Sequence, residues 1–306
     1  MKYYEIKNTD IKASSIIGGC MWLPKVSEKE NQELIETALE MGINFFDHAD
    51  IYFGGESEKA FSKVLEERPS VREKIYIQSK CGIQRKYYDF SKEHIIDSVE
   101  GSLKRLKTDY LDVLLLHRPD TLMEPEEVAE AFNQLEKAGK VKYFGVSNQT
   151  PGQMELLGKY VRQKLVFNQL QFGLAHTCLI DSGLAHNTYY DQGIYRDSGT
   201  LEYCRMNDIT IQAWSPLQRG RFEGTFINDL ENYGPLNELL DELGSKYMVS
   251  KAGIATAWIL RHPAKIQVIL GTTNKNHLIE SCQGNDIELT RKEWYDLYCA
   301  AGNMIP

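Results

Sequence analysis

The sequence lacks the features that would place the protein on a nucleic acid or in a membrane. Its 35 Lys and Arg are outnumbered by 43 Asp and Glu, which gives a net charge of −8. A general nucleic-acid surface is not indicated, because phosphate contacts need clustered cations. No apolar stretch approaches the ~20 residues that span a bilayer, and the first residues lack the basic flank and apolar core of a signal peptide. We therefore expect a cytoplasmic protein with no membrane and no nucleic-acid partner.

Paired cysteines and internal linkers are also missing. The six cysteines are widely spaced and form no C-x-x-C pair, which indicates neither a zinc knuckle nor a disulfide framework. With 42% hydrophobic and 25% charged residues, the composition is that of an ordinary folded protein. No linker, low-complexity segment or block of charge divides the 306 residues. We expect a single domain over 1–306.

A short apolar run followed by an amphipathic segment is repeated about eight times along the chain. The apolar runs are rich in β-branched and aromatic residues, which is typical of buried parallel strands. They span 14–20, 44–50, 75–81, 110–117, 141–148, 165–172, 209–216 and 266–273. The segments with helical periodicity span roughly 27–41, 56–68, 91–107, 125–139, 151–163, 199–207, 250–262 and 274–284.

This alternation predicts an α/β fold built from parallel βαβ units. Eight units in a chain of this length fit a closed (β/α)8 TIM barrel better than a doubly wound sheet, because such barrels typically need about 250 residues. Residues 1–10 predict a cap strand before the barrel, and 290–302 predicts a C-terminal helix across it. Two long connections, 173–198 and 218–233, follow the sixth and seventh strands, and the second carries Arg221 near its start. Long loops at that face of a barrel tend to bind or cover ligands.

Four polar residues stand at or just past the ends of three consecutive predicted strands: Asp47, Tyr52, Lys80 and His117. Because the carboxyl ends of all strands in a parallel barrel meet at one rim, we expect these side chains to converge. Tyrosine is a weak acid with a pKa near 10, and the ammonium of Lys80 is expected to stabilise the phenolate and lower that pKa. Asp47 would hold Lys80 charged, and His117 would orient a carbonyl by a hydrogen bond. A proton-donating site of this kind indicates carbonyl reduction.

The segment 42–52, Gly-Ile-Asn-Phe-Phe-Asp-His-Ala-Asp-Ile-Tyr, followed by Lys80 and His117, closely resembles the aldo-keto reductase family, in particular its bacterial oxidoreductases. The resemblance runs from about residue 10 to the C-terminus. It includes Gly-Val-Ser-Asn at 145–148 and Asn-Gln at 168–169. It implies a barrel that binds NADPH extended across the rim without a Rossmann motif.

The resemblance also implies a role for each half of the site. Tyr52 is then the general acid in the NAD(P)H-dependent reduction of an aldehyde or ketone to an alcohol, Lys80 and Asp47 tune it, and His117 positions the carbonyl. Trp214 is implied to stack on the nicotinamide ring. The residues implied to hold the carboxamide are Ser147, Asn148 and Gln169, and those implied to contact the pyrophosphate are Ser215, Leu217 and Arg219.

The adenosine end of the expected cofactor site departs from the family's usual pattern. Gly271 stands where the family commonly has a Lys, and His277 where it has an Arg that reads the 2′-phosphate. The helix N-terminus after the eighth strand can receive a phosphate through its backbone N–H groups, assisted by the hydroxyls of Thr272 and Thr273. We expect NADPH as the cofactor, with NADH use open. Candidate substrate-pocket residues are Met21, Trp22, Phe53 and His176.

Three other functions stay open on the sequence. Lys80 could act as the Schiff-base nucleophile of an aldolase-like enzyme, but Asp47 nearby would raise its pKa, which counts against this. A metal hydrolase would leave Lys80 and Tyr52 without roles, so we expect no metal. Its ligands would be Asp47, His48, Asp50 and His117. A non-catalytic, nucleotide-binding regulatory subunit is the third, and the sequence fixes neither the substrate, the oligomeric state nor the conformation of 173–198.

Overall fold

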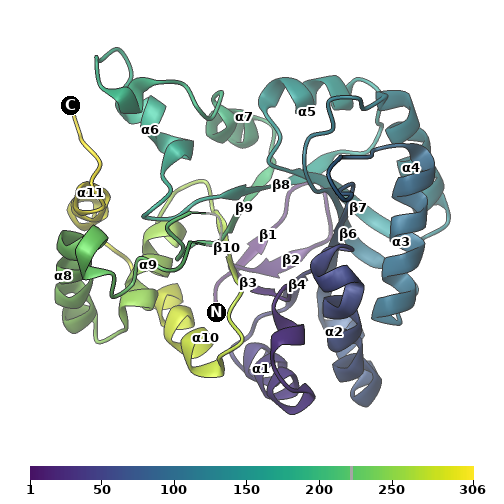
Figure 1. Ribbon diagram of the computed structural model, residues 1–306, viewed down its shortest axis with the longest axis horizontal. Helices are drawn as coiled ribbons and strands as arrows, with labels where there is room; N and C mark the ends of the chain where they lie inside the picture. The colour runs from purple at the N-terminus through teal and green to yellow at the C-terminus, as the bar shows by residue number, and fades with distance from the viewer. Residues whose placement is uncertain (221–222) are drawn as a thin grey trace.

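The computed structural model of the protein describes residues 1–220 and 223–306, and in them eight parallel strands close into a barrel surrounded by helices (Figure 1). The barrel strands are β3 Ile16–Gly19, β4 Phe45–Asp47, β5 Tyr76–Cys81, β6 Leu111–Leu116, β7 Val141–Ser147, β8 Leu165–Gln171, β9 Thr210–Trp214 and β10 Gln267–Leu270. Neighbouring strands pair in chain order, and β10 closes the ring by pairing with both β9 and β3. The predicted single-domain (β/α)8 barrel is confirmed.

The expected helices form, and most end within a few residues of the predicted positions, whereas the one predicted over 151–163 ends at Gly158. They are α1 Glu28–Glu40, α2 Glu56–Glu67, α3 Lys92–Leu106, α4 Pro125–Lys137, α5 Pro151–Gly158, α7 Thr200–Met206, α9 Lys251–Leu260, α10 Lys275–Cys282 and α11 Arg291–Ala300. Side-chain caps explain several starts. Ser27 and Thr290 each accept a hydrogen bond from the third helical residue, whose Glu side chain accepts one in return from the cap backbone.

Two helices were not predicted. Helix α6, Cys178–Leu184, lies inside the 173–198 connection, and α8, Leu230–Tyr247, begins in the 218–233 connection and extends well beyond it. Pro235 lies near the start of α8, and Tyr233 departs from helical backbone angles there, which hides the helical pattern. Arg221 lies outside the described residues.

A two-stranded hairpin covers the end of the barrel where the strands begin. Strands β1 Tyr3–Glu5 and β2 Lys12–Ser14 pair antiparallel, so the expected cap consists of two strands. Ile6, Ile11 and Ala13 of this hairpin belong to one buried cluster with residues inside the barrel. With this end closed by apolar packing, the opposite rim is left for a site.

Helix α11 packs across the outside of the barrel beside α8, and Figure 1 shows the two together at one edge of the molecule. Trp294 of α11 stacks on Trp258 of α9 at 4.9 Å between ring centroids, and each indole N–H donates to the other residue's backbone carbonyl. Among the described residues, no helix is both long and apolar enough to cross a membrane. The cytoplasmic location stays a prediction from the sequence.

Candidate active site

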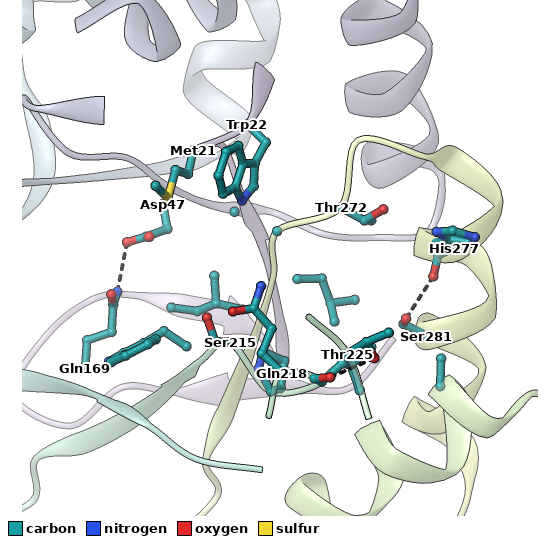
Figure 2. Close-up of a pocket in the computed structure, with 18 of the residues that line it drawn as sticks. Met21, Trp22, Asp47, Gln169, Ser215, Gln218, Thr225, Thr272, His277 and Ser281 are labelled. Carbon is teal, nitrogen blue, oxygen red and sulfur yellow. Dashed lines mark hydrogen bonds between the residues drawn. The ribbon is translucent and has the colours of Figure 1, made fainter. Parts of the chain in front are cut away.

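A cavity of about 940 Å³ lies at the rim where the barrel strands end. Figure 2 shows Met21 and Trp22, which follow β3, on one side of it and His277 and Ser281 of α10 on another, with Gln218 reaching between them. Many residues selected from the sequence line this one cavity. They are Met21, Trp22, Asp47, Tyr52, Phe53, His117, Ser147, Asn148, Gln169, Trp214, Ser215, Leu217, Gly271, Thr272 and His277.

Lys80 lies beneath the cavity and joins two of its lining residues. Its ammonium Nζ is 2.7 Å from Oδ2 of Asp47 and 3.1 Å from the phenol oxygen of Tyr52, and it also donates to the His48 carbonyl at 2.6 Å. The side chain of Lys80 is fully buried. The Tyr52 and His117 rings meet edge to face, with centroids 5.9 Å apart. The structure therefore brings the four strand-end residues together.

The turn after β4 explains how Tyr52 reaches this position. Tyr52 opens a short 3-10 helix, Tyr52–Gly55, in which Phe53, Gly54 and Gly55 have φ angles of 49°, 64° and 90°. Left-handed backbone is easy for glycine and strained for Phe53. A Cβ on Gly55 would lie 2.5 Å from Cδ of Arg105, so glycine is required there. This turn points the Tyr52 ring back toward Lys80 and leaves the Phe53 ring at the cavity.

Burial changes the expected electrostatics of the Tyr52–Lys80 pair. Burial raises the pKa of Tyr52 above its ordinary value, and the neighbouring Lys80 ammonium offsets this only in part. The expectation of a lowered pKa is wrong, because removal from water penalises the phenolate more than the ammonium stabilises it. Burial lowers the pKa of Lys80, but Asp47 and Tyr52 together outweigh it, so the net pKa lies above the ordinary value. A lysine held charged in this way is a poor Schiff-base nucleophile.

Buried amides hold the second oxygen of Asp47. Its Oδ1 accepts hydrogen bonds from Gln78 at 2.6 Å and Gln169 at 2.9 Å. Both amides also donate to Gln212, which donates in turn to Gln267. These glutamines come from β5, β8, β9 and β10, so a chain of amides crosses the barrel interior and ends on Asp47. This row of hydrogen-bonded amides was not predicted from the sequence, although each of the glutamines interrupts an otherwise apolar strand.

The ends of β7, β8 and β9 form a second, connected group. Asn148 has a φ of 58°, accepts a hydrogen bond from the Trp214 indole at 3.1 Å and donates one to Ser147 at 2.8 Å. The Ser147 hydroxyl donates to the Gln169 carbonyl at 2.9 Å. A non-glycine residue in left-handed backbone at a cavity wall indicates a functional constraint. Ser147, Asn148, Gln169 and Trp214 are thus locked into one surface beside the Tyr52 group.

Apart from Lys80 beneath it, three predicted site residues among those described do not line the cavity. Arg219 instead makes an ion pair with Asp229 at 2.7 Å and donates to the Glu223 carbonyl. His176 lies outside the lining, in a turn in which its backbone pairs with that of Gly173. Thr273 is also outside the lining, whereas its neighbour Thr272 faces the cavity. The Arg219 guanidinium is thus turned toward partners in its own loop.

Comparison with known proteins agrees with this geometry. A model described as the Aldo/keto reductase family matches residues 15–298. The chain belongs to the aldo/keto reductase family. It is therefore an oxidoreductase, of a family that acts on small carbonyl compounds. The extension of the domain to all of 1–306 stays a prediction.

Relatives of this aldo/keto reductase cover nearly its whole length. It is 36% identical to the uncharacterized oxidoreductase YcsN of Bacillus subtilis, over 97% of both chains. It is also 36% identical to a 6-dehydroglucose reductase of Agrobacterium fabrum, over 88% of this chain and 87% of the relative. Among solved structures, the thermostable aldo-keto reductase Tm1743 superposes with a TM-score of 0.78 at 25% identity, covering 98% of this chain and 100% of the other.

Several lining residues of this aldo/keto reductase were missed from its sequence. They are Gly19, Ile51, Ile83, Arg118, Pro216, Gln218, Gly224, Thr225, Ile227, Asn228, Ser250, Lys251, Ala252, Ile269, Leu270, Glu280 and Ser281. Those from 224–228 and 250–252 flank α8, so a helix that was not recognised prevented their placement. Arg118 could have been selected from the sequence, because it directly follows His117 at the end of β6.

A buried charged network lies behind the Tyr52 group of this reductase. Glu58 accepts hydrogen bonds from Arg105 at 2.6 Å and from Ser79 at 2.7 Å. Burial raises the pKa of nearby Asp50 to about 6 and lowers that of His48 to about 3. His48 packs its neutral ring against Phe61. Within the described part of the chain, no three His, Cys, Asp or Glu side chains are grouped so that they could hold a metal ion.

Proposed function

We propose that this enzyme reduces an aldehyde or ketone to an alcohol with NADPH, and that Tyr52 donates the proton. Membership of the family supports carbonyl reduction with a nicotinamide cofactor in general. The observation that carries the finer assignment is the 3.1 Å hydrogen bond from the Lys80 ammonium to the Tyr52 phenol oxygen at the cavity. A phenol hydroxyl beside a fixed positive charge suits proton donation, because the charge stabilises the phenolate that forms.

The size and the lining of the cavity fit a nicotinamide cofactor. Its volume of about 940 Å³ lies near the upper end of the ~300–1,000 Å³ typical of small-molecule sites. The amide nitrogen of Gln169 donates hydrogen bonds to Asp47 and Gln212, whereas its Oε1 accepts no hydrogen bond from the described residues. This oxygen, at the cavity wall, suits the N–H donors of a carboxamide. Ser147 and Asn148 would flank that group, and the Trp214 ring would support the nicotinamide.

The remaining contacts follow along the cavity toward α10. Ser215 and Leu217 would lie along the pyrophosphate, and Ser215 has a φ of 49°, another left-handed position at the wall. At the far end, Thr272 and His277 face the cavity near the start of α10, where backbone N–H groups favour a phosphate. A Cβ added at Gly271 would meet nothing closer than Trp22 at 3.9 Å, so this wall is open. We propose NADPH, with His277 beside the 2′-phosphate.

The side chains then divide the chemistry among them. When bound, the reduced nicotinamide supplies the hydride to the carbonyl carbon. Tyr52 and His117 both face the carbonyl oxygen, and the Tyr52 proton passes to that oxygen as negative charge develops on it. Lys80 stabilises the phenolate that remains, and it can do so because Asp47 keeps it charged. Since these groups are held by buried hydrogen bonds before the reaction, little reorganisation is needed in the transition state.

The reaction can be tested with a panel of carbonyl compounds. Aldehydes, α-dicarbonyls, quinones, ketones and 6-dehydroglucose, the substrate that the name of a relative indicates, are each mixed with enzyme and NADPH or NADH. We expect the reduced-nicotinamide absorbance to fall with at least one carbonyl compound, and faster with NADPH. If no compound causes oxidation of NADPH or NADH, the alternative of a non-catalytic nucleotide-binding subunit remains. If calorimetry also shows no NADPH binding, that alternative is excluded as well.

Borohydride trapping distinguishes the proposed reductase from an aldolase-like enzyme. An aldolase-like enzyme would form an imine on Lys80 that borohydride reduces to a stable adduct. We expect no adduct on Lys80 by mass spectrometry, because this ammonium is buried and held charged by Asp47.

A further inference from the structure

The Tyr52 end of the cavity is lined mainly by aromatic and apolar side chains. We define this end by Tyr52 and by the lining residues that are linked to it through sequence neighbours or ring contacts: Ile51, Phe53, Trp22, His117, Arg118 and Trp214. Trp22 and Phe53 meet edge to face at 5.5 Å, so aromatic rings form the walls. Apart from Tyr52 and His117, which serve the carbonyl in the proposed function, the polar member of this set is Arg118.

Arg118 is held over an aromatic ring next to the reacting groups. It follows His117 directly, so their Cα atoms are about 3.8 Å apart. Its guanidinium carbon lies 5.6 Å from the centroid of the Trp214 ring. A guanidinium within about 6 Å of an aromatic ring is attracted to it, and its planar N–H donors match the oxygens of a carboxylate or phosphate.

The surrounding charges reinforce this positive end. Lys25 holds its ammonium 5.2 Å from the centroid of the Phe53 ring, on the same aromatic pair. Among the described lining residues, the carboxylates are those of Asp47 and Glu280. Asp47 is neutralised by Lys80, and Glu280 belongs to α10 at the other end. A chain with net charge −8 thus places two cations around the Tyr52 end, which would attract an anionic substrate.

We propose that the enzyme selects carbonyl compounds that carry an anionic group, a carboxylate or a phosphate, and that Arg118 binds this group. The proposal rests on the proposed function, because it places the carbonyl at Tyr52 and His117. The body of the substrate, planar or apolar, lies between the carbonyl and the anion and contacts Trp22 and Phe53. Arg118 determines specificity and takes no part in proton transfer.

Matched aldehydes test the proposal. 4-Formylbenzoate carries the anion, its methyl ester is a neutral compound of similar shape, 4-formylphenyl phosphate replaces carboxylate by phosphate, and 6-dehydroglucose is a neutral polyol. We expect kcat/KM with NADPH to be at least tenfold higher for 4-formylbenzoate than for its ester, chiefly through a lower KM. The preference falls as salt concentration rises, because screening weakens an exposed charge pair. The phosphate compound identifies which anion fits better.

Variants of Arg118 complete the experiment. Arg118→Leu is expected to lower the ratio between acid and ester about tenfold, and Arg118→Lys to restore part of it, since the charge returns without the planar fork. Arg205→Leu, which removes an exposed arginine outside the cavity, controls for net charge and leaves the ratio as in the wild type. NADPH affinity by calorimetry and a melting curve verify that each variant is folded.

The outcomes separate the two proposals. If neither these aldehydes nor any compound of the wider carbonyl panel is reduced, the proposed function fails. If panel compounds are reduced but both anionic aldehydes are not, the proposed function stands and the role of Arg118 is wrong. If the aldehydes are reduced without preference for the anion, or if the preference survives Arg118→Leu, the proposed function stands and the role of Arg118 is wrong. A preference for 6-dehydroglucose over both anionic aldehydes would also overturn the inference. Should Arg118→Leu not fold, the wild-type salt dependence and the Arg118→Lys ratio decide the question.

Discussion

The Lys80 ammonium donates a 3.1 Å hydrogen bond to the phenol oxygen of Tyr52, so a residue of β5 and a residue of the turn after β4 act as one unit. Asp47 binds the same ammonium at 2.7 Å. The barrel supplies this geometry, because strands that are neighbours in the sheet end at the same rim. The proposed reaction requires that Lys80 is charged and that Tyr52 is protonated.

The pH dependence of reduction follows from the raised pKa of Tyr52. Proton donation needs the neutral phenol, and a pKa above the ordinary value near 10 keeps the proton in place through the neutral and mildly alkaline range. We expect no alkaline loss of kcat between pH 7.5 and 9.5, with a decline only above about pH 10. A steady-state profile of kcat in that range is the measurement. A midpoint near pH 8 would mean that another group, or a lowered tyrosine pKa, controls the rate.

Asp50 makes stability depend on pH. Burial raises its pKa to about 6, well above its value in the unfolded chain. The stability that its proton contributes is present below about pH 4 and is lost as pH rises through about 6. Asp50→Asn should therefore gain stability relative to the wild type by about 2 kcal/mol between pH 4.5 and 7.5.

Thermal or urea unfolding at the two pH values measures this gain. The variant Asp109→Asn, at an exposed position, controls for the loss of one negative charge. An Asp50→Asn variant whose advantage is the same at both pH values would show that Asp50 is ionised in the folded protein at pH 4.5.

Much of the fold could be predicted because its determinants are local. All eight barrel strands were found as apolar runs, but several runs were too long. The last one, predicted as 266–273, forms a strand only over Gln267–Leu270. Periodicity shows that a segment is buried, whereas strand ends are fixed by pairing with neighbours. Helix α8 was missed because Pro235 and the irregular Tyr233 obscured a stripe that Leu236, Leu240 and Leu243 bury.

The candidate site could likewise be predicted where it depends on strand ends, but not where it depends on a loop or on the depth of burial. Residues at strand ends, such as Lys80 and Asn148, could be placed because barrel topology fixes where a strand ends. Arg219 was misplaced because its partner Asp229 is the N-cap of the unrecognised helix. The sign of the Tyr52 pKa shift was wrong because it depends on how deeply the ring is buried, which no local pattern reveals.

The Glu58–Arg105 pair should support the turn that carries Tyr52. Glu58 is fully buried, and Arg105 also packs against Gly55 of that turn. Arg105→Leu would leave the buried Glu58 carboxylate with the Ser79 hydroxyl as its remaining hydrogen-bond partner among the described residues, and we expect a loss of about 3 kcal/mol in the free energy of unfolding. Urea unfolding measures it. Lys107→Leu, which breaks an exposed pair with Glu66, is the control and should change stability little.

His277 should control the choice between cofactors if it lies beside the 2′-phosphate. His277→Arg adds a permanent charge and bidentate donors, so calorimetry should show NADPH binding about tenfold more tightly, with NADH affected little. His186→Arg, at an exposed position outside the cavity, is the matched control. Equal gains for both cofactors would place His277 against another part of the nucleotide.

The central claim is that Tyr52 is the proton donor, and Tyr52→Phe tests it most directly. The substitution keeps the ring and removes only the hydroxyl that Lys80 contacts. With a carbonyl substrate from the panel, the account predicts that kcat falls about 10²–10⁴-fold, while NADPH affinity measured by calorimetry stays near that of the wild type. A Tyr52→Phe enzyme with an unchanged rate would contradict it.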